Sequence, residues 1–578
     1  MGIPITSGAV EDPAAAYLEG LSPQQRRQTG QVFTPRHLVE FILGQAEYAP
    51  FRDRPSLLDP SCGAGAFLAA AAEVIAGRLV QSGLDVGSPS GRCRLLEIFE
   101  GSLFGVDIDA DALKLARHGL IEVVKKWTKV SPPSAFLRHN LVTADFLVDP
   151  DVRDLPPVRQ GGFDLIVGNP PYVSASRLPA EYKEQLRARF ETAIGRIDLY
   201  TVFMEQAVSL LRPGGRFAFI TPDKFLTSQT SVALRRLLRQ TGAVRSIARF
   251  RSHKVFADAA TVPCVTVFDR AAKPGSLAVL ECDDRPNSSG QVRVIGSRRA
   301  DAGALSDEGW QFDAPELRLI AAAIEGRHST LGRFTARHSA GLATGRDALY
   351  VLAEGAAEVE RELLRPIVRG RDLLPYQITE PRLSLLVPYT FDSSGQPALI
   401  DVKKYPKAIA YLRRHESVLR ARHCVRVWQK AWFDLHDPVP TDIGRLPKIL
   451  VPDVASHNRF AYDPGRYWPL HSAYYVVPRD IDPIYLTAVL NSTPIEFLIR
   501  LRAPVVKDGF SRYRKQFLEP LPVPQASLTE RAEIVSAVTK GDFERADRLV
   551  MRLYRLRRSD LRQVRAFLVD AAGGRRQA

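Results

Sequence analysis

The sequence predicts an α/β fold with a twisted, mainly parallel sheet in its first half, and a mixed α+β region in its second half. Two observations carry this prediction. Up to about residue 270, short apolar runs alternate with helical stretches, as strands and helices alternate in βαβ units. From about residue 330 the alternation fades, and short strand-like runs, prolines and basic–aromatic mixtures replace it.

Composition indicates a multi-domain protein with a polyanionic partner. With 578 residues the chain can form two to four domains, and its net charge is +15. Its five scattered cysteines lack zinc-ligand spacing and favour a reducing cytoplasm. We expect no signal peptide, because residues 1–13 lack a basic region followed by an apolar core. We expect no membrane span, because the apolar stretch 66–80 contains Glu73 and Arg78.

The first predicted helix follows a polar lead-in at residues 1–29. Thr34 is a favourable N-cap residue and Pro35 a favourable first helical residue. Leu38 and Ile42 give the helix an apolar face. Two interpretations remain open, namely a well-capped helix with no further role, or a helix start that presents free N–H groups to a carboxylate.

A glycine-containing turn joins the first predicted strand to the next helix. Asp59 ends a short apolar run and is followed by Gly63 and Gly65. Glycines at a βα turn let a ligand lie against the backbone, and the acid can cap the turn or contact the ligand. No Gly-Lys-Ser/Thr follows, which excludes a Walker loop, and Leu68 occupies the third glycine position of the dinucleotide fingerprint.

Acidic residues also end the next two predicted strands. Asp107 follows the run 103–106, at the position where such folds bind ribose hydroxyls, and Ile108 could lie on an adenine face. We expect Asp109 to be a helix N-cap. Asp145 and Phe146 could grip an adenine amino group and edge, or could be a turn acid beside a core phenylalanine. The stretch 81–101, which separates the glycine turn from Asp107, resembles a surface insertion.

The run 163–167 leads into Gly168-Asn169-Pro170-Pro171-Tyr172. Two prolines prevent helix and sheet pairing there and stiffen the backbone. The Asn169 side chain and the Pro170 carbonyl offer hydrogen-bond acceptors, and Tyr172 offers a flat face. Together they could hold an exocyclic amine and stack on the ring that bears it. The alternative is a proline-rich turn with a packed tyrosine.

The remaining segments suggest a core cysteine and a basic second half. Cys264 lies inside the apolar run 262–268, which favours a buried cysteine over a nucleophile. Residues 411–432 mix basic side chains with Trp428 and Trp432, as expected for phosphate contacts or for a solvated helix face. We expect a lead-in at 1–29, a catalytic domain at 30–275, a linker at 276–335, a specificity domain at 336–525 and a basic helical segment at 526–578.

The motifs, taken in order, resemble those of a known family. Phe33-Thr34-Pro35, the Asp59–Gly65 turn, Asp107-Ile108-Asp109, Asp145-Phe146 and Asn169-Pro170-Pro171-Tyr172 resemble the gamma arrangement of restriction–modification N6-adenine DNA methyltransferases, which use S-adenosylmethionine. Residues 340–525 resemble the TaqI-type C-terminal specificity domain, through Thr344-Gly345-Arg346-Asp347, the segment 367–372 and Leu490-Asn491-Ser492. The resemblance implies a Rossmann-like class I methyltransferase domain followed by a DNA-recognition domain. One departure is the long gap between Gly65 and Asp107.

The resemblance also implies roles for individual residues. Thr34 and Pro35 would lie near the methionine end of the cofactor, while Asp107 holds ribose and Asp145 binds the adenine amino group. Ile108 and Phe146 would sandwich the adenine. The remaining implied cofactor contacts are Asp59, Cys62, Gly63, Gly65 and Asn169. Asn169, Pro170 and Tyr172 would be catalytic, with Tyr172 and Phe256 packing on the target base. Candidate DNA contacts are Arg346, Arg369, Arg371, Lys507, Arg512 and Arg514.

The implied activity is methylation of adenine N6 in double-stranded DNA, without a metal, by a bacterial cytoplasmic monomer. A separate cognate endonuclease would cut unmodified DNA, with no direct contact to this chain. The overall resemblance suggests GTCGAC as the target sequence. Alternatives are N4-cytosine methylation, N5-glutamine methylation of a protein, and a non-catalytic DNA-recognition subunit of a defence complex.

Overall fold

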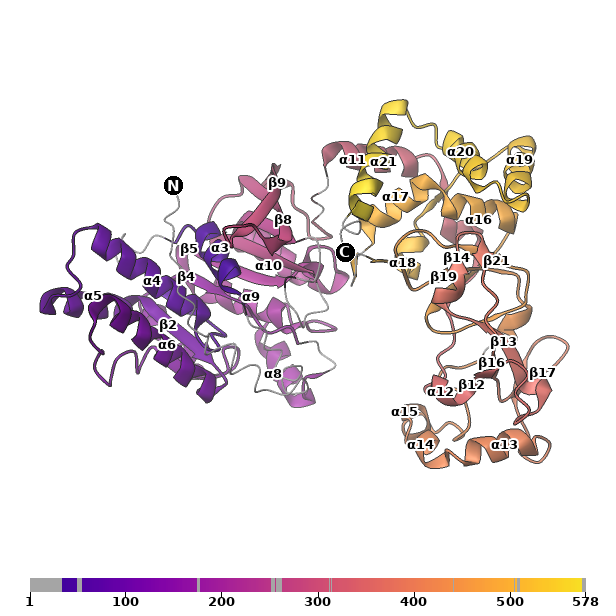
Figure 1. Cartoon of the computed structure of the whole chain (residues 1–578), viewed down its shortest axis with the longest axis horizontal. Helices are drawn as coiled ribbons and strands as arrows, with labels where there is room; N and C mark the ends of the chain where they lie inside the picture. Colours follow the sequence, from indigo (N-terminus) through magenta and orange to yellow (C-terminus); the bar gives the residue numbers. More distant parts are fainter. Residues whose placement is uncertain are drawn as a thin grey trace. The chain divides into compact units, whose positions relative to one another are not determined.

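The chain divides into two compact units, Met1–Phe312 and Asp313–Ala578. The computed structural model in Figure 1 describes residues 34–48, 55–173, 177–250, 255, 262–310, 312, 314–439, 441–503, 505–506 and 510–573.

The first unit is built on a nine-stranded sheet with the strand order β3-β2-β1-β4-β5-β7-β6-β8-β9. The first five strands along the chain pair in parallel, whereas β7 is antiparallel to both β5 and β6. This confirms the predicted, mainly parallel α/β sheet. The strands are β1 (Leu57–Asp59), β2 (Leu103–Asp107), β3 (Leu141–Thr143), β4 (Phe163–Gly168), β5 (Leu211–Pro222), β6 (Gly242–Phe250), β7 (Pro263–Arg270), β8 (Ser276–Pro286) and β9 (Val292–Asp301).

Helices cover both faces of this sheet (Figure 1). One apolar core packs α3 (Arg36–Gln45), α4 (Ala66–Gln81), α5 (Pro89–Ser102) and α6 (Ala110–Thr128) on one face. The other core packs α8 (Ala180–Arg189), α9 (Leu199–Leu210) and α10 (Val232–Thr241) on the opposite face. Because side chains alternate along a strand, Leu165 and Val167 enter the first core and Ile166 enters the second. This two-sided burial explains why the strands are continuous apolar runs.

The expected surface insertion at 81–101 is instead part of the core. Its second half forms α5, and Leu95 and Phe99 are fully buried. Ser88 caps the helix by accepting a hydrogen bond from the Gly91 N–H at 3.1 Å. Glycine, serine and proline at the helix start hid the helical pattern, because they also mark loops.

The structure also moves the boundary between the units. The expected linker at 276–335 contains β8 and β9, which extend the nine-stranded sheet, and β6 pairs with β8 in parallel. The turn at 272–275 therefore joins two strands of one sheet. The boundary follows Phe312, and α11 (Pro315–Glu325) lies in the second unit.

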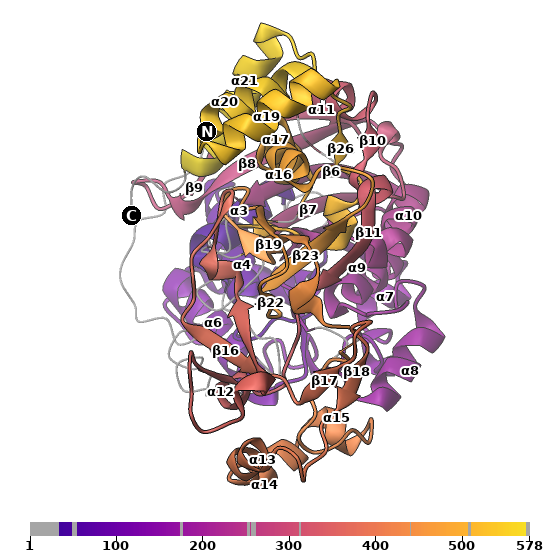
Figure 2. The same ribbon diagram turned by 90° about the vertical axis from the view of Figure 1, so that its right-hand side faces the viewer.

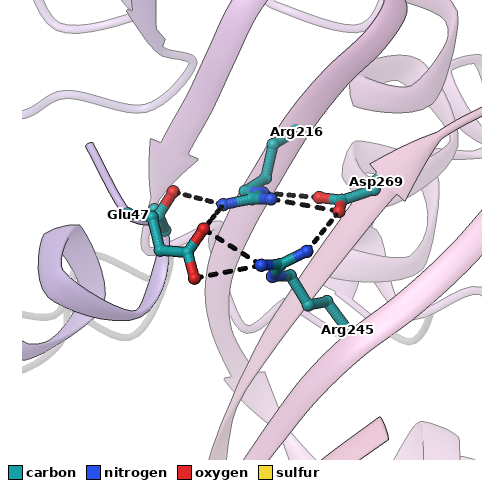
Figure 3. A network of polar contacts seen from close by, with 5 residues as sticks. Glu47, Arg216, Arg245 and Asp269 are labelled. Atoms are coloured by element: carbon teal, nitrogen blue, oxygen red, sulfur yellow. Dashed lines mark hydrogen bonds and ion pairs between the residues drawn. The ribbon is translucent and has the colours of Figure 1, made fainter. Parts of the chain in front are cut away.

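A four-membered ionic network ties the end of α3 to three strands (Figure 3). Arg216 on β5 donates to Asp269 on β7 and to the Ala46 carbonyl, the latter at 2.7 Å. Arg245 on β6 donates to both carboxylate oxygens of Glu47, at 3.0 and 3.1 Å, and lies 3.4 Å from Asp269. The two arginines thus alternate with two acids and fix α3 on the sheet.

The second unit is a mixed α+β structure with two apolar cores, as predicted (Figures 1 and 2). One four-stranded sheet has the order β11 (Thr335–Ala340), β23 (Ala473–Pro478), β19 (Lys448–Pro452) and β21 (Ala461–Asp463). The other has the order β12 (Val351–Ala353), β16 (Leu383–Leu386), β13 (Leu364–Val368) and β22 (Trp468–Pro469).

Helices complete each core of the second unit. The first core combines α11 with α16 (Pro483–Asn491), α17 (Thr493–Arg502), α19 (Leu528–Thr539), α20 (Phe543–Leu553) and α21 (Arg558–Gly573). The described part of the segment 526–578, which was expected as a separate element, therefore contributes helices to this core. The second core is covered by α12 (Asp347–Tyr350), α13 (Pro406–Arg413) and α14 (Glu416–Arg420), and α15 (His423–Arg426) follows α14.

Candidate active site

Four strand ends of the first unit meet at one edge of the sheet. Since β1, β2, β3 and β4 are parallel, Asp59, Asp107, Thr143 and Gly168 end their strands on the same side. The predicted motifs at 59–65, 107–109, 145–146 and 169–172 follow these ends directly. The carboxyl edge of a parallel sheet is the usual position of a ligand crevice.

The glycine turn is held by Asp107. The Gly63 N–H donates to Asp107 Oδ2 at 2.7 Å, and the Asp109 N–H donates to Oδ1 at 2.9 Å. Gly65 has a φ of +84°, and a Cβ there would lie 2.8 Å from the Ala116 side chain on α6. Burial raises the pKa of Asp107. Ile108 beside it is 62% exposed, so an apolar face lies open next to a buried acid.

Asp59 and Cys62 point into the protein rather than toward solvent. Asp59 accepts a hydrogen bond from the Ser61 N–H at 3.2 Å, and a Cβ on Gly168 would lie 2.8 Å from its Oδ1. Burial raises the pKa of Asp59 well above its usual range, as it does for the Cys62 thiol. These two residues therefore shape the turn, and the side chain of Cys62 belongs to the apolar core.

Asn169 is fixed by a contact that the sequence did not predict. Its Nδ2 donates to Thr34 Oγ1 at 3.1 Å, across 135 residues of chain, and Ser61 Oγ donates to its backbone carbonyl at 3.3 Å. The N-cap of α3 is Pro35 rather than Thr34, so the expected cap is wrong and the Thr34 hydroxyl serves Asn169 instead. Because the amide nitrogen Nδ2 is the atom that faces Thr34, the amide oxygen Oδ1 points away from Thr34.

Tyr172 is anchored at the neighbouring strand. Its hydroxyl donates to the Ile220 carbonyl of β5 at 3.3 Å, and its ring packs partly against the first core. Burial raises the pKa of Tyr172 well above its usual range, so the phenol is neutral. Pro170, which follows Asn169, is buried. The segment that follows β4 thus has a fixed amide and a fixed aromatic ring, separated by two prolines.

The structure separates the predicted pair Asp145 and Phe146. Phe146 is 2% exposed, and its ring centroid lies 5.1 Å from that of Phe203, so it is a core residue and not an open face. Asp145 accepts hydrogen bonds from the Leu147 N–H at 2.9 Å and from the Tyr182 hydroxyl of α8 at 2.8 Å. Sequence reasoning missed Tyr182, because nothing near it in the chain indicates that α8 approaches β3.

Two further residues clarify the chemistry of this edge. Cys264 is fully buried in β7, and burial raises the pKa of its thiol to about 12, which confirms a core cysteine. Asp223 follows β5 directly, and burial raises the pKa of its carboxyl to about 6. The sequence signal for Asp223 was present but unused, since it is another acid that follows a strand end.

We expect Asp223→Asn to remove a pH dependence of stability. The folded chain holds the Asp223 proton up to about pH 6, whereas the unfolded chain loses it near pH 4, so the free energy of unfolding falls as pH rises between these values. The substitution should therefore stabilise the protein at pH 7.5, by up to about 3 kcal/mol, and have little effect at pH 4. Thermal unfolding at both pH values tests this, with the exposed Asp151→Asn as control. An equal shift at both pH values would contradict it.

The predicted DNA contacts differ in their surroundings. Arg346 and Arg371 are exposed. Arg369 donates from Nε to Asp372 Oδ2 at 3.1 Å within its own turn. Arg512 and Arg514 both face Asp453, at 3.5 and 3.6 Å. Phe256 and Lys507 lie outside the described residues.

Within the described ranges, no group of three or more histidine, cysteine, aspartate or glutamate side chains is placed to hold a metal ion. No helix in the same part of the chain is long and apolar enough to cross a membrane.

Known proteins resemble both units. Residues 101–256 match the Eco57I restriction-modification methylase family, and residues 365–523 match the TaqI-like C-terminal specificity domain. The chain is 28% identical to type II methyltransferase M.XhoI of Xanthomonas vasicola, over 92% of this chain and 98% of the relative. It is 26% identical to M.PaeR7I of Pseudomonas aeruginosa, over 94% and 95%.

A solved structure shares the fold across most of the chain. The type IIL restriction-modification enzyme MmeI, solved in complex with DNA, has a TM-score of 0.66 at 14% identity. The match covers 96% of this chain and 80% of MmeI.

Proposed function

We propose that the chain is a type II restriction–modification methyltransferase, like the relatives that it matches over most of its length, and that it methylates adenine N6 within a specific double-stranded DNA sequence. The observation that supports this activity most directly is the Asn169 amide, whose nitrogen is bound by Thr34 at 3.1 Å at the tip of β4. That contact places the acceptor oxygen Oδ1 away from Thr34, as a clamp for an exocyclic amine requires.

The residues at the sheet edge fit S-adenosylmethionine. Gly63 and Gly65 form a turn that has no space for a Cβ at residue 65, and Asp107 holds the turn by accepting a hydrogen bond from the Gly63 N–H. The exposed Ile108 offers an apolar surface for an adenine ring, and Asp145 offers carboxylate oxygens for an amino group. When bound, S-adenosylmethionine supplies an electrophilic methyl group.

Asn169, Pro170 and Tyr172 supply the remaining chemistry. The target base has to leave the duplex, at a cost of a few kcal/mol, and stacking on Tyr172 offsets about 1–3 kcal/mol of it. Asn169 Oδ1 and the Pro170 carbonyl accept the two hydrogens of the amine. This moves the nitrogen toward tetrahedral geometry, directs its lone pair outward and stabilises the positive charge that develops on it. The remaining contribution to catalysis is the positioning of the amine nitrogen in line with the methyl group that it attacks.

The alternative functions differ from this proposal either in the amine that is methylated or in having no catalytic activity. N4-cytosine methylation would use the same clamp on another base. Methylation of protein glutamine is disfavoured by the charge of +15 and by the second unit, which matches a specificity domain. A non-catalytic recognition subunit would have no need for the Thr34–Asn169 contact. We assign cleavage of unmodified DNA to a separate endonuclease and expect this chain to act as a monomer.

Sequencing of modified DNA tests the proposal. The purified chain is assayed with labelled S-adenosylmethionine, and DNA from cells that express it is sequenced by a method that detects modified bases. N6-methyladenine confined to one short sequence supports the proposal, and GTCGAC is the sequence expected from the overall resemblance. Detection of N4-methylcytosine instead would show that the target base is cytosine and not adenine. Absence of both label transfer and cofactor binding would contradict the enzyme.

A further inference from the structure

The segment from α13 to α15 carries a strong positive charge. Between residues 403 and 430 the chain has nine basic side chains and one acid, Glu416, which pairs with Arg420 at 2.6 Å. Such a density favours contact with a polyanion. The nine are Lys403, Lys404, Lys407, Arg413, Arg414, Arg420, Arg422, Arg426 and Lys430.

Two of these cations are internal and stiffen the segment. Arg422 is 6% exposed, donates to the carbonyls of Thr344 at 2.9 Å and Trp432 at 2.8 Å, and lies over the Tyr350 ring. Lys430 Nζ donates to the Leu435 carbonyl at 2.9 Å. These contacts fix the loop after α15 to the body of the unit, so the remaining cations stand on a rigid support.

The short helix α12 joins this segment to the loop that carries Arg346. The Tyr411 hydroxyl of α13 donates to the Leu349 carbonyl at 3.0 Å, and the Tyr350 hydroxyl donates to the Phe433 carbonyl at 3.0 Å. Figures 1 and 2 both show α12 to α15 gathered at one end of the second unit. Arg346 is the N-cap residue of α12 and therefore lies next to this segment in the chain's fold.

Trp428 stands on this surface with 52% of its area exposed. Its ring centroid lies 5.3 Å from that of His423 and 5.0 Å from that of His436, and the His436 N–H donates to the Thr344 carbonyl at 3.2 Å. The other four tryptophans are buried or half-buried. The exposed part of the Trp428 ring offers an apolar face with a polar N–H, a combination that is common in residues that contact a partner.

We propose that Arg346, Arg413, Arg414, Arg426 and Trp428 form a basic arm that grips the DNA backbone independently of sequence. The proposal rests on the proposed function, because it takes duplex DNA as the partner. The four arginines are exposed, and within the described part of the chain none of them pairs with a carboxylate. Their guanidinium groups bind phosphates, and the Trp428 ring packs on the sugar of the same strand. Phosphate contacts set affinity and register but carry no sequence information.

Trp428 provides a built-in probe of the arm. Acrylamide quenching of tryptophan fluorescence is measured with and without a duplex, in the full chain and in Trp428→Phe. We expect DNA to protect the wild-type chain and not the variant, because Trp428 is the exposed tryptophan. Equal protection in both would show that DNA lies elsewhere and would overturn the arm.

Salt dependence tests the arginines. Arg413→Ala combined with Arg426→Ala should weaken binding to cognate and unrelated duplexes alike, and reduce the slope of log K against log salt by about 2. The methylated sequence should be unchanged. Lys114→Ala with Lys125→Ala on α6, where both lysines pair with acids, removes the same charge and should leave the slope unchanged.

The outcomes distinguish the arm from the enzyme. An unchanged slope in the arginine variant, with methylation intact, would overturn the arm and leave the proposed function standing. If the arginine variant lost affinity only for the cognate duplex, the arm would not bind DNA independently of sequence. Failure of the wild-type chain to bind or methylate any DNA would contradict the proposed function itself.

Discussion

Replacement of Asn169 by alanine is expected to abolish methyl transfer, with a loss of at least about 1000-fold in kcat. The substitution removes the Oδ1 acceptor for one amine hydrogen and also the Nδ2 contact to Thr34 at 3.1 Å. More of the nitrogen lone-pair density then stays delocalised in the ring of the base, and the developing charge keeps only the Pro170 carbonyl as a partner. Transfer of a labelled methyl group to DNA measures the loss.

Controls separate chemistry from folding in this experiment. Calorimetric binding of S-adenosylmethionine should persist in Asn169→Ala, because Asp107 and the Gly63 turn are untouched. Asn169→Asp keeps an acceptor oxygen but loses the donor to Thr34, so we expect activity between those of the wild type and alanine. Activity retained in Asn169→Ala would rule out the clamp mechanism.

Replacement of Lys448 by methionine is expected to destabilise the second unit by about 3–5 kcal/mol. Lys448 and Asp463 are both fully buried, and their charged atoms lie 2.7 Å apart. Burial lowers the pKa of Lys448, and Lys448 Nζ also donates to the Ile443 and Leu446 carbonyls, both at 3.0 Å. Without the ammonium, a buried carboxylate keeps only its backbone donors, such as the Tyr467 N–H at 3.0 Å.

Thermal unfolding measures this effect against two comparisons. The exposed pair Lys515–Glu519 has a similar chemistry, and Lys515→Met should cost less than about 1 kcal/mol. Lys448→Met with Asp463→Leu should recover part of the stability, because no unpaired charge is then buried. Equal melting temperatures for Lys448→Met and Lys515→Met would show that the buried pair is not a stabilising element.

Strand ends and acids were predictable from sequence because their signals are local. An apolar run that stops at Asp107, or at Asn169 before two prolines, identifies both the element and the residue at its tip. The ligand edge of the sheet follows from the parallel arrangement. For the same reason the Asp109 cap was correct, with its carboxylate accepting from the Asp111 N–H at 3.0 Å.

Contacts across long stretches of chain could not be predicted in this way. Thr34 has the sequence signature of a cap, yet its hydroxyl accepts from Asn169. Phe146 follows an acid at a strand end like Ile108, but only Ile108 is exposed, because Phe203 covers the former. Arg422 belongs to a basic run and is nevertheless buried. In each case the deciding partner lies far away in sequence.

The network of Glu47, Arg216, Arg245 and Asp269 has a consequence for the order of folding (Figure 3). Glu47 and Arg245 are 198 residues apart in the chain, so the network completes the docking of α3 only after β5, β6 and β7 have been synthesised and paired. Thr34 precedes α3 and reaches Asn169 through that docking. A nascent chain that ends before Asp269 therefore lacks part of the network that holds the end of α3, the helix that Thr34 directly precedes.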